Sequence, residues 1–135
     1  MSPMPKKKHL ESDTKKAIKA LLDEHGWFWW SPPAGAFGVS GIADLQAVKA
    51  GMFVALEVKR GTAAPKPTAL QIGFLNSIRA ADHFAFVVND ARVTHLKAFL
   101  EALDRSITAA QRKEQPAPED GAMMLNAIHE MQGEL

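Results

Sequence analysis

The stretch from residue 42 to residue 59 decides the fold: Ile42-Ala-Asp-Leu-Gln-Ala-Val-Lys-Ala-Gly-Met-Phe-Val-Ala-Leu-Glu-Val-Lys59. Two apolar runs, 42–48 and 52–59, flank a short turn at 49–51 that contains a glycine. Apolar runs of this length on either side of a glycine turn are typical of a β-hairpin. The segment therefore predicts two neighbouring antiparallel strands near the middle of the chain.

Helices and further strands are predicted on both sides of this hairpin. Apolar residues at helical spacing, tight glycine or proline loops and residues that cap helices mark the boundaries. The predicted order is a helix from near Leu10 to Gly26, a strand at 27–30, the hairpin, a helix from Thr68 to about Ala81, a strand at 85–89, a helix capped by Asp90, and a short helix at 122–132. This order predicts an α/β fold with a mixed central sheet flanked by helices.

Length and composition favour one globular domain. A chain of 135 residues with 47% hydrophobic residues is long enough to bury a real core. We expect a flexible basic arm at 1–8, the domain at 9–110, and a polar linker with a C-terminal helix at 111–135. No apolar run has membrane-spanning length, and the arm lacks the apolar segment of a signal peptide. The absence of cysteine excludes a disulfide scaffold and fits a cytoplasmic setting.

The charge distribution is more informative than the net charge, which is only +1. Basic residues gather in the first segment and around the middle of the chain, and acidic residues gather in the tail. A locally basic face can bind phosphates on a protein that is nearly neutral overall. Solvated surface lysines account equally well for the pattern. The basic residues concerned are Lys6, Lys7, Lys8, Lys15, Lys16, Lys19, Lys59, Arg60 and Lys66.

The second strand of the hairpin carries two charges at its end. Alternation places Glu57 and Lys59 on the same face as Phe53 and Ala55. Burying a charge is costly, so adjacent opposite charges on an apolar strand indicate a partner or a metal. Taken alone, the pair is more typical of an ordinary strand-end ion pair.

Asp44 strengthens the metal interpretation. If 42–48 and 52–59 pair, Asp44 lies near the same end of the hairpin as Glu57. Two adjacent carboxylates repel unless a cation lies between them, and their oxygens, with the Val58 carbonyl, suit Mg²⁺ or Mn²⁺. Lys59 could orient an attacking water or neutralise phosphate charge. By itself, Asp44 would be interpreted as a turn-capping aspartate.

Two polar residues fall on apolar helical stripes. Glu11 lies seven positions before Ile18 and eleven before Leu22, and Gln71 lies three and four positions before Phe74 and Leu75. These spacings place both polar side chains on the buried sides of their helices. Glu11 and Gln71 could each reach the predicted metal site. Alternatively, Glu11 marks a frayed helix start and Gln71 bonds to the backbone.

Together these residues resemble a known family, the virus-type replication-repair nucleases (VRR-NUC) of the PD-(D/E)xK superfamily. The resemblance covers roughly residues 9–90, and its motifs are Gly41-x-x-Asp44, Glu57-x-Lys59 and Thr68-x-x-Gln71, with Glu11 on a preceding helix. It implies a restriction-endonuclease-like core and Mg²⁺- or Mn²⁺-dependent DNA cleavage. The metal ligands would be Glu11, Asp44, Glu57 and the Val58 carbonyl, with Lys59 assisting the nucleophile and Gln71 steadying the site. Ala43 stands where the family often has proline, a departure that concerns loop stiffness more than chemistry.

The resemblance also implies partners. Small members of the family resemble dimeric, junction-resolving nucleases of phages and bacteria. We therefore expect a homodimer that cuts duplex, flapped or branched DNA in the cytoplasm of a bacterium or a phage-infected cell. Contacts to DNA are expected from Lys15, Arg60 and Lys66, and Phe37 could stack on a base or pack on the sheet. The run Trp27-Phe-Trp-Trp30 has too many rings for a strand with one wet side, so some of them must meet a helix or a partner. The alternatives are an inactive nucleic-acid-binding module and a phage regulatory protein that uses the same fold.

Overall fold

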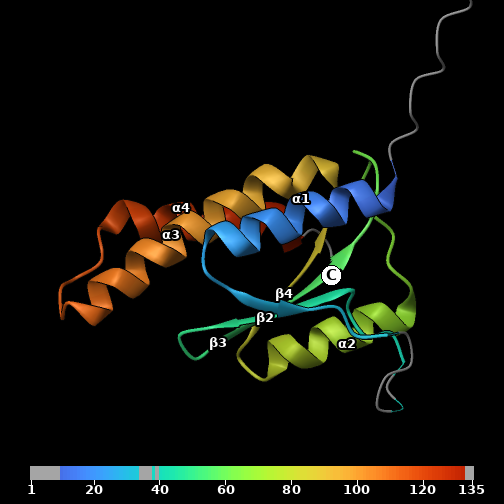
Figure 1. The fold of residues 1–135 in the computed structure, drawn as a ribbon, viewed down its shortest axis with the longest axis horizontal. Coiled ribbons are helices and arrows are strands. Elements are labelled where there is room, and N and C mark those ends of the chain that lie inside the picture. The colour runs from blue at the N-terminus through green and yellow to red at the C-terminus, as the bar shows by residue number, and fades with distance from the viewer. Residues whose placement is uncertain (1–9, 34–37, 39, 133–135) are drawn as a thin grey trace, which may run out of the picture.

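A computed structural model describes residues 10–33, 38 and 40–132. The elements run in the order α1 (Glu11–Glu24), β1 (Phe28–Trp30), β2 (Leu45–Lys49), β3 (Met52–Val58), α2 (Ala69–Ala80), β4 (Phe84–Val88), the 3₁₀ turn η2 (Asp90–Arg92), α3 (Val93–Gln111) and α4 (Pro118–Gln132). The predicted mixed α/β fold is confirmed, because the strands form one sheet with helices on both faces (Figure 1). None of the described helices is long and apolar enough to cross a bilayer.

The sheet has the strand order β1-β2-β3-β4. Its first three strands are antiparallel, and β4 runs parallel to β3. A two-residue turn, Ala50 with φ 50° and Gly51 with φ 79°, joins β2 to β3. Such positive φ angles at both central residues match the twist of the flanking strands, so the predicted hairpin is confirmed.

Two apolar cores lie on the two faces of the sheet. Val54, Leu56 and Val58 point into the larger core, which is closed by α1, α3 and α4. Ala55 points into the smaller core under α2, with Leu75. The predicted alternation along β3 is therefore confirmed, and it places Glu57 on the α2 side of the sheet.

Strand β2 begins later than predicted. It starts at Leu45, not at Ile42, so Asp44 precedes the strand and does not belong to it. The ladder stops here because the Asp44 carboxylate takes the Val58 N–H, with Oδ2 2.8 Å from the nitrogen. At this end of the hairpin, the Val58 N–H therefore bonds to a side chain and not to a main-chain carbonyl of the neighbouring strand. This hydrogen bond holds the Asp44 carboxylate at the end of β3.

Asp90 does not cap a helix with its side chain, contrary to the prediction. It is the first residue of η2, and its carboxylate accepts hydrogen bonds from the Thr14 hydroxyl and the Gly61 N–H, each at 2.7 Å. These contacts join α1, the loop after β3 and the end of β4. The Asp90 side chain, which the local sequence predicts to cap a helix, therefore bonds to Thr14 and Gly61, two residues that are distant in the sequence.

The C-terminal helix is longer than predicted, because α4 starts at Pro118 and not near residue 122. Its Ala127 and Met131 are buried in the larger core, so α4 packs on the domain that we expected to end near residue 110. Leu125, on the same helix, is 69% exposed.

Candidate active site

A glycine places the Asp44 loop against α2. Gly41 has φ +72°, and a Cβ added to it would lie 2.4 Å from the Leu70 carbonyl carbon and oxygen. No other residue type tolerates both the conformation and the contact. The loop therefore passes directly over the first turn of α2. Three residues further along the loop, the Asp44 side chain lies at the end of β3, where it accepts the Val58 N–H.

Glu57 is the buried acid of the site. It is only 2% exposed although it carries a carboxyl group. Burial is the main reason that its pKa is raised from 4.5 to about 8; the hydrogen bond and the negative charge of Asp44 raise it further, whereas Lys59 lowers it. At neutral pH and without a metal, Glu57 therefore holds a proton.

Gln71 holds Glu57 in place and also caps α2. Its Nε2 donates to Glu57 Oε1 at 2.7 Å, while its Oε1 accepts from the Thr68 N–H at 2.8 Å. The Thr68 hydroxyl in turn accepts from the Gln71 N–H. This reciprocal pair is a capping box. Both interpretations of Gln71 are therefore correct. The amide nitrogen bonds to the carboxyl group of Glu57, and the amide oxygen bonds to the backbone N–H of Thr68.

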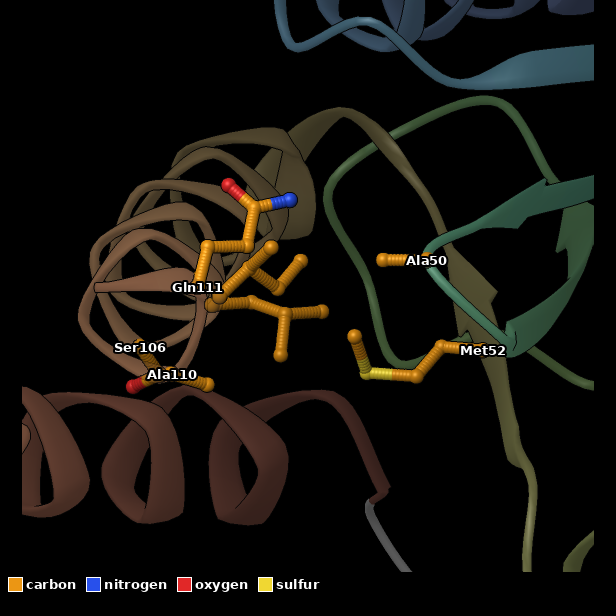
Figure 2. A pocket seen from close by; sticks show the side chains of 7 residues that line it. Ala50, Met52, Ser106, Ala110 and Gln111 are labelled. Carbon is orange, nitrogen blue, oxygen red and sulfur yellow. The ribbon is translucent and has the colours of Figure 1, made fainter. Parts of the chain in front are cut away.

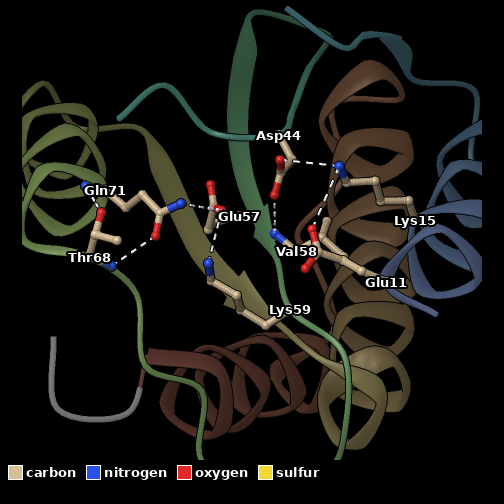
Figure 3. A network of polar contacts seen from close by, with 8 residues as sticks. All are labelled: Glu11, Lys15, Asp44, Glu57, Val58, Lys59, Thr68 and Gln71. Carbon is tan, nitrogen blue, oxygen red and sulfur yellow. Dashed lines mark hydrogen bonds and ion pairs between the residues drawn. The ribbon is translucent and has the colours of Figure 1, made fainter. Parts of the chain in front are cut away.

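Lysines lie on both sides of the carboxylates (Figure 3). Lys59 Nζ is 3.6 Å from Glu57 Oε1, so the two charged residues at the end of β3 do share a face. Lys15, on α1, places its Nζ 3.2 Å from Asp44 Oδ1 and 3.8 Å from Glu11 Oε1. Each acidic side chain of the central pair thus lies within 4 Å of a lysine ammonium group.

Glu11 differs from its expected position. Its side chain is 43% exposed, because it is the first residue of α1, whereas the buried stripe consists of Thr14, Ile18 and Leu22. Lys15 lies within ion-pair distance of both Glu11 and Asp44 and so connects the two acids. Among the described residues, no group of three or more histidines, cysteines or carboxylates is arranged to hold a metal ion.

The two central carboxylates fit a hard divalent cation. Glu57 Oε2 is buried and no N–H or O–H donor of another described residue reaches it, so the contact between the Glu57 and Asp44 carboxyl groups requires a shared proton or a cation. An orphaned carboxylate oxygen beside a second carboxylate is a donor set for Mg²⁺ or Mn²⁺. The Val58 N–H is used by Asp44, while a role for the Val58 carbonyl stays a prediction.

The residues expected to contact DNA lie in different settings. Arg60 and Lys66 are exposed on the loop between β3 and α2. Lys15 is partly buried and pairs with Asp44, a contact that sequence reasoning missed although the Glu11–Lys15 spacing of four positions was visible. Phe37 and the arm at 1–8 lie outside the described residues.

The side chain of Thr14 was also missed. It is buried on α1 and donates to Asp90, which in turn holds Gly61 two positions after Lys59. The four-residue repeat of Thr14, Ile18 and Leu22 could have revealed an inward hydroxyl. This connection ties the Lys59 loop to α1.

A groove elsewhere on the molecule is a poor candidate for the chemistry. It has a volume of about 430 Å³ and lies between the hairpin turn and α3 (Figure 2). Its lining includes Met52, Leu103 and Ile107 and contains no titratable side chain. The candidate catalytic groups lie at the opposite end of the hairpin, where Asp44 meets β3.

Comparison with known proteins identifies no relative: no family model, no curated protein and no solved structure matches this chain.

Proposed function

We propose that this protein is a divalent-metal-dependent nuclease that hydrolyses phosphodiester bonds in DNA, with a restriction-endonuclease-like core of the VRR-NUC type. The observation that carries the proposal is the buried Glu57 beside Asp44, with its orphaned Oε2 and a pKa of about 8. Strongly perturbed carboxyl groups with specific charged neighbours concentrate at functional sites. An ordinary strand-end ion pair does not require a second carboxylate.

Each residue has a task in this proposal. Asp44, Glu57 and the Val58 carbonyl hold Mg²⁺ or Mn²⁺, with Glu11 as an outer contributor. The metal, when bound, supplies an activated water and neutralises phosphate charge. Lys59, whose ammonium lies 3.6 Å from Glu57, orients the nucleophile or the phosphate. Gln71 keeps the Glu57 carboxylate from rotating.

The proposed substrate is DNA with branches, flaps or four-way junctions. Arg60 and Lys66 are exposed on the loop that follows Lys59 and would contact backbone phosphates, as would Lys15, and Phe37 would meet a base. Phosphate contacts position a duplex and carry little sequence information. Selectivity would therefore come from the shape of the substrate.

The test is cleavage of labelled single-stranded, duplex, flap and four-way-junction DNA with Mg²⁺ or Mn²⁺. Asp44→Asn and Lys59→Ala should each lower the cleavage rate by about 100-fold or more, because each removes a charged group at the reacting phosphate. Lys97→Ala is the matched control, since Lys97 is an exposed lysine on α3 whose ion pair with Glu101 lies outside the site. It should cleave at the wild-type rate.

Two outcomes would contradict the proposal. Equal cleavage by wild type, Asp44→Asn and Lys59→Ala would assign the activity to a contaminant or to another site. DNA binding without cleavage on any substrate, with no binding of Mn²⁺, would support an inactive nucleic-acid-binding module.

A further inference from the structure

We infer that Asp90 is a positioning residue of the proposed site, because it binds the loop after β3 and helix α1 at the same time. It thereby holds Lys59 and Lys15 on the two sides of the central carboxyl pair. The inference deepens the proposed nuclease function and rests on that function for its effect on cleavage. The contacts that carry it involve neither metal nor DNA.

The loop after β3 is attached to the end of β4 at every second residue. The Lys59 N–H donates to a β4 carbonyl at 3.0 Å, and the Gly61 carbonyl accepts from the Asp90 N–H at 3.0 Å. Further along, the buried Asn89 donates from Nδ2 to the Ala63 carbonyl at 2.8 Å. The path of the chain beyond Lys59 is therefore set by the residues at the end of β4.

The Asp90 carboxylate joins this loop to α1. Its Oδ2 accepts the Gly61 N–H and its Oδ1 accepts the Thr14 hydroxyl, each at 2.7 Å. Together with its main-chain N–H, Asp90 thus binds both backbone groups of Gly61. An amide at this position could not replace it, because an amide has one acceptor oxygen whereas a carboxylate has two.

Each of the two segments carries one lysine of the site. The loop carries Lys59, whose Nζ lies 3.6 Å from the Glu57 carboxyl group, and α1 carries Lys15, whose Nζ lies 3.2 Å from Asp44 Oδ1. In both cases the lysine is one or two positions from the residue that Asp90 binds. A lysine side chain is flexible, so its ammonium group has a defined place only if its main chain is held. Asp90 therefore sets the positions from which both ammonium groups approach the carboxyl pair.

Asp90 acts through these lysines and not on the substrate. Each of its carboxylate oxygens already accepts a hydrogen bond from the protein. Glu57 differs in this respect, because no donor of another described residue reaches its Oε2. Misplacing a catalytic group by about 1 Å can lower a rate about 100-fold. Loss of the Asp90 contacts should therefore reduce catalysis by misplacing Lys59.

Asp104 provides a matched control, because it makes the same kind of connection at the opposite end of the hairpin. Its carboxylate accepts from Lys49 Nζ at 2.7 Å, next to the hairpin turn, and contacts His25 Nδ1 at the end of α1. Asp44 precedes the other end of β2. Asp104 thus also ties α1 to the sheet, but away from the proposed site.

The first experiment measures kcat and KM in saturating Mn²⁺, on the labelled DNA that the wild type cuts fastest. Asp90→Asn should lower kcat about 10- to 100-fold and leave KM close to that of the wild type. Asp104→Asn should keep both wild-type constants. The double variant Asp90→Asn with Lys59→Ala should cleave at the rate of Lys59→Ala alone, because Asp90 acts through Lys59.

Thr14→Val tests the contact with α1 by itself, and it replaces Asp90→Asn if that variant does not fold. Valine keeps the shape of threonine but lacks the hydroxyl that donates to Asp90 Oδ1. Its kcat should fall about 3- to 10-fold, since one of two contacts is lost. Thr14→Ser restores the hydroxyl and should restore the wild-type rate.

The second experiment uses the metal-free protein without DNA. Amide hydrogen exchange at Lys59 and Gly61, followed by NMR, should be about tenfold faster in Asp90→Asn than in the wild type, and faster in Thr14→Val as well. It should be unchanged in Asp104→Asn.

Three results would each overturn the inference: unchanged exchange at Lys59 and Gly61 in Asp90→Asn, an equal loss of cleavage in Asp104→Asn, or losses that multiply in the double variant. If the wild type cuts no DNA, the nuclease proposal fails, while the exchange rates still decide whether Asp90 holds the two segments.

Discussion

Lys15 Nζ lies 3.2 Å from Asp44 Oδ1, so an ammonium group from α1 neutralises a carboxylate that we propose as a metal ligand. The same ammonium lies 3.8 Å from Glu11. In the metal-free protein, Lys15 is therefore the cation that compensates Asp44. A bound divalent metal would take over this role and repel the lysine.

Replacing Lys15 should change the melting temperature differently without and with metal. Lys15→Met should lower the melting temperature in EDTA by a few degrees, because Asp44 loses its counter-charge beside Glu57. In saturating Mn²⁺ the difference should shrink or reverse. Thermal melts under both conditions measure this, with the exposed Lys16→Met as control. An equal loss in EDTA and in Mn²⁺ would show that Lys15 acts only through packing.

The raised pKa of Glu57 makes stability depend on pH. Between about pH 4.5 and pH 8 the folded protein keeps a proton that the unfolded chain releases. The contribution of Glu57 to the free energy of unfolding is therefore complete below pH 4.5 and is lost as the pH rises to 8, by at most about 1.4 kcal/mol per pH unit. Glu57→Gln imitates the protonated acid and should flatten this slope. Urea unfolding in EDTA at pH 5, 6, 7 and 8 measures it, and Glu24→Gln on the exposed side of α1 should keep the wild-type slope.

Gln71 and Thr68 can be separated by function. Gln71→Glu keeps an oxygen for the Thr68 N–H but loses the Nε2 donor to Glu57, so DNA cleavage should fall about 10- to 100-fold. Thr68→Ala removes a cap and should cost about 1 kcal/mol of stability with cleavage close to wild type. Urea unfolding and cleavage rates on both variants check the pair. Equal losses of activity would mean that the capping box, and not the Glu57 contact, supports the site.

Two glycines with the same φ provide a matched test of the Asp44 loop. Gly41 and Gly38 both have φ +72°, but a Cβ on Gly41 meets the Leu70 backbone at 2.4 Å, whereas a Cβ on Gly38 meets nothing within 4 Å. Gly38→Ala should cost about 1 kcal/mol, the ordinary penalty of this conformation. Gly41→Ala should cost clearly more and reduce cleavage, because the loop must lift off α2. Equal free energies of unfolding for the two variants would refute the close contact.

Much of the site was predictable because its residues lie on regular elements. The period of two along β3 placed Glu57 and Lys59 on one face, and the pairing of two strands about a tight turn placed Asp44 near Glu57. The capping pattern Thr68-x-x-Gln71 located the start of α2, and the helical stripe indicated that Gln71 faces inward. Glu11 was less predictable, since a residue at the very start of a helix can turn toward solvent.

The sequence alone determined the α/β class, the hairpin, the faces of β3 and the set of polar residues that converge at its end, because these follow from local periodicity and turn chemistry. Only the tertiary structure decided the partners of the site residues. Lys15 reaches Asp44, and Asp90 leaves its expected cap for Thr14 and Gly61, because long-range packing brings these groups within hydrogen-bonding distance. It also decided that the Arg79 and Arg92 side chains donate to the carbonyls of Ala85 and Val87 on β4, because the local sequence does not indicate which distant carbonyl a guanidinium group will contact.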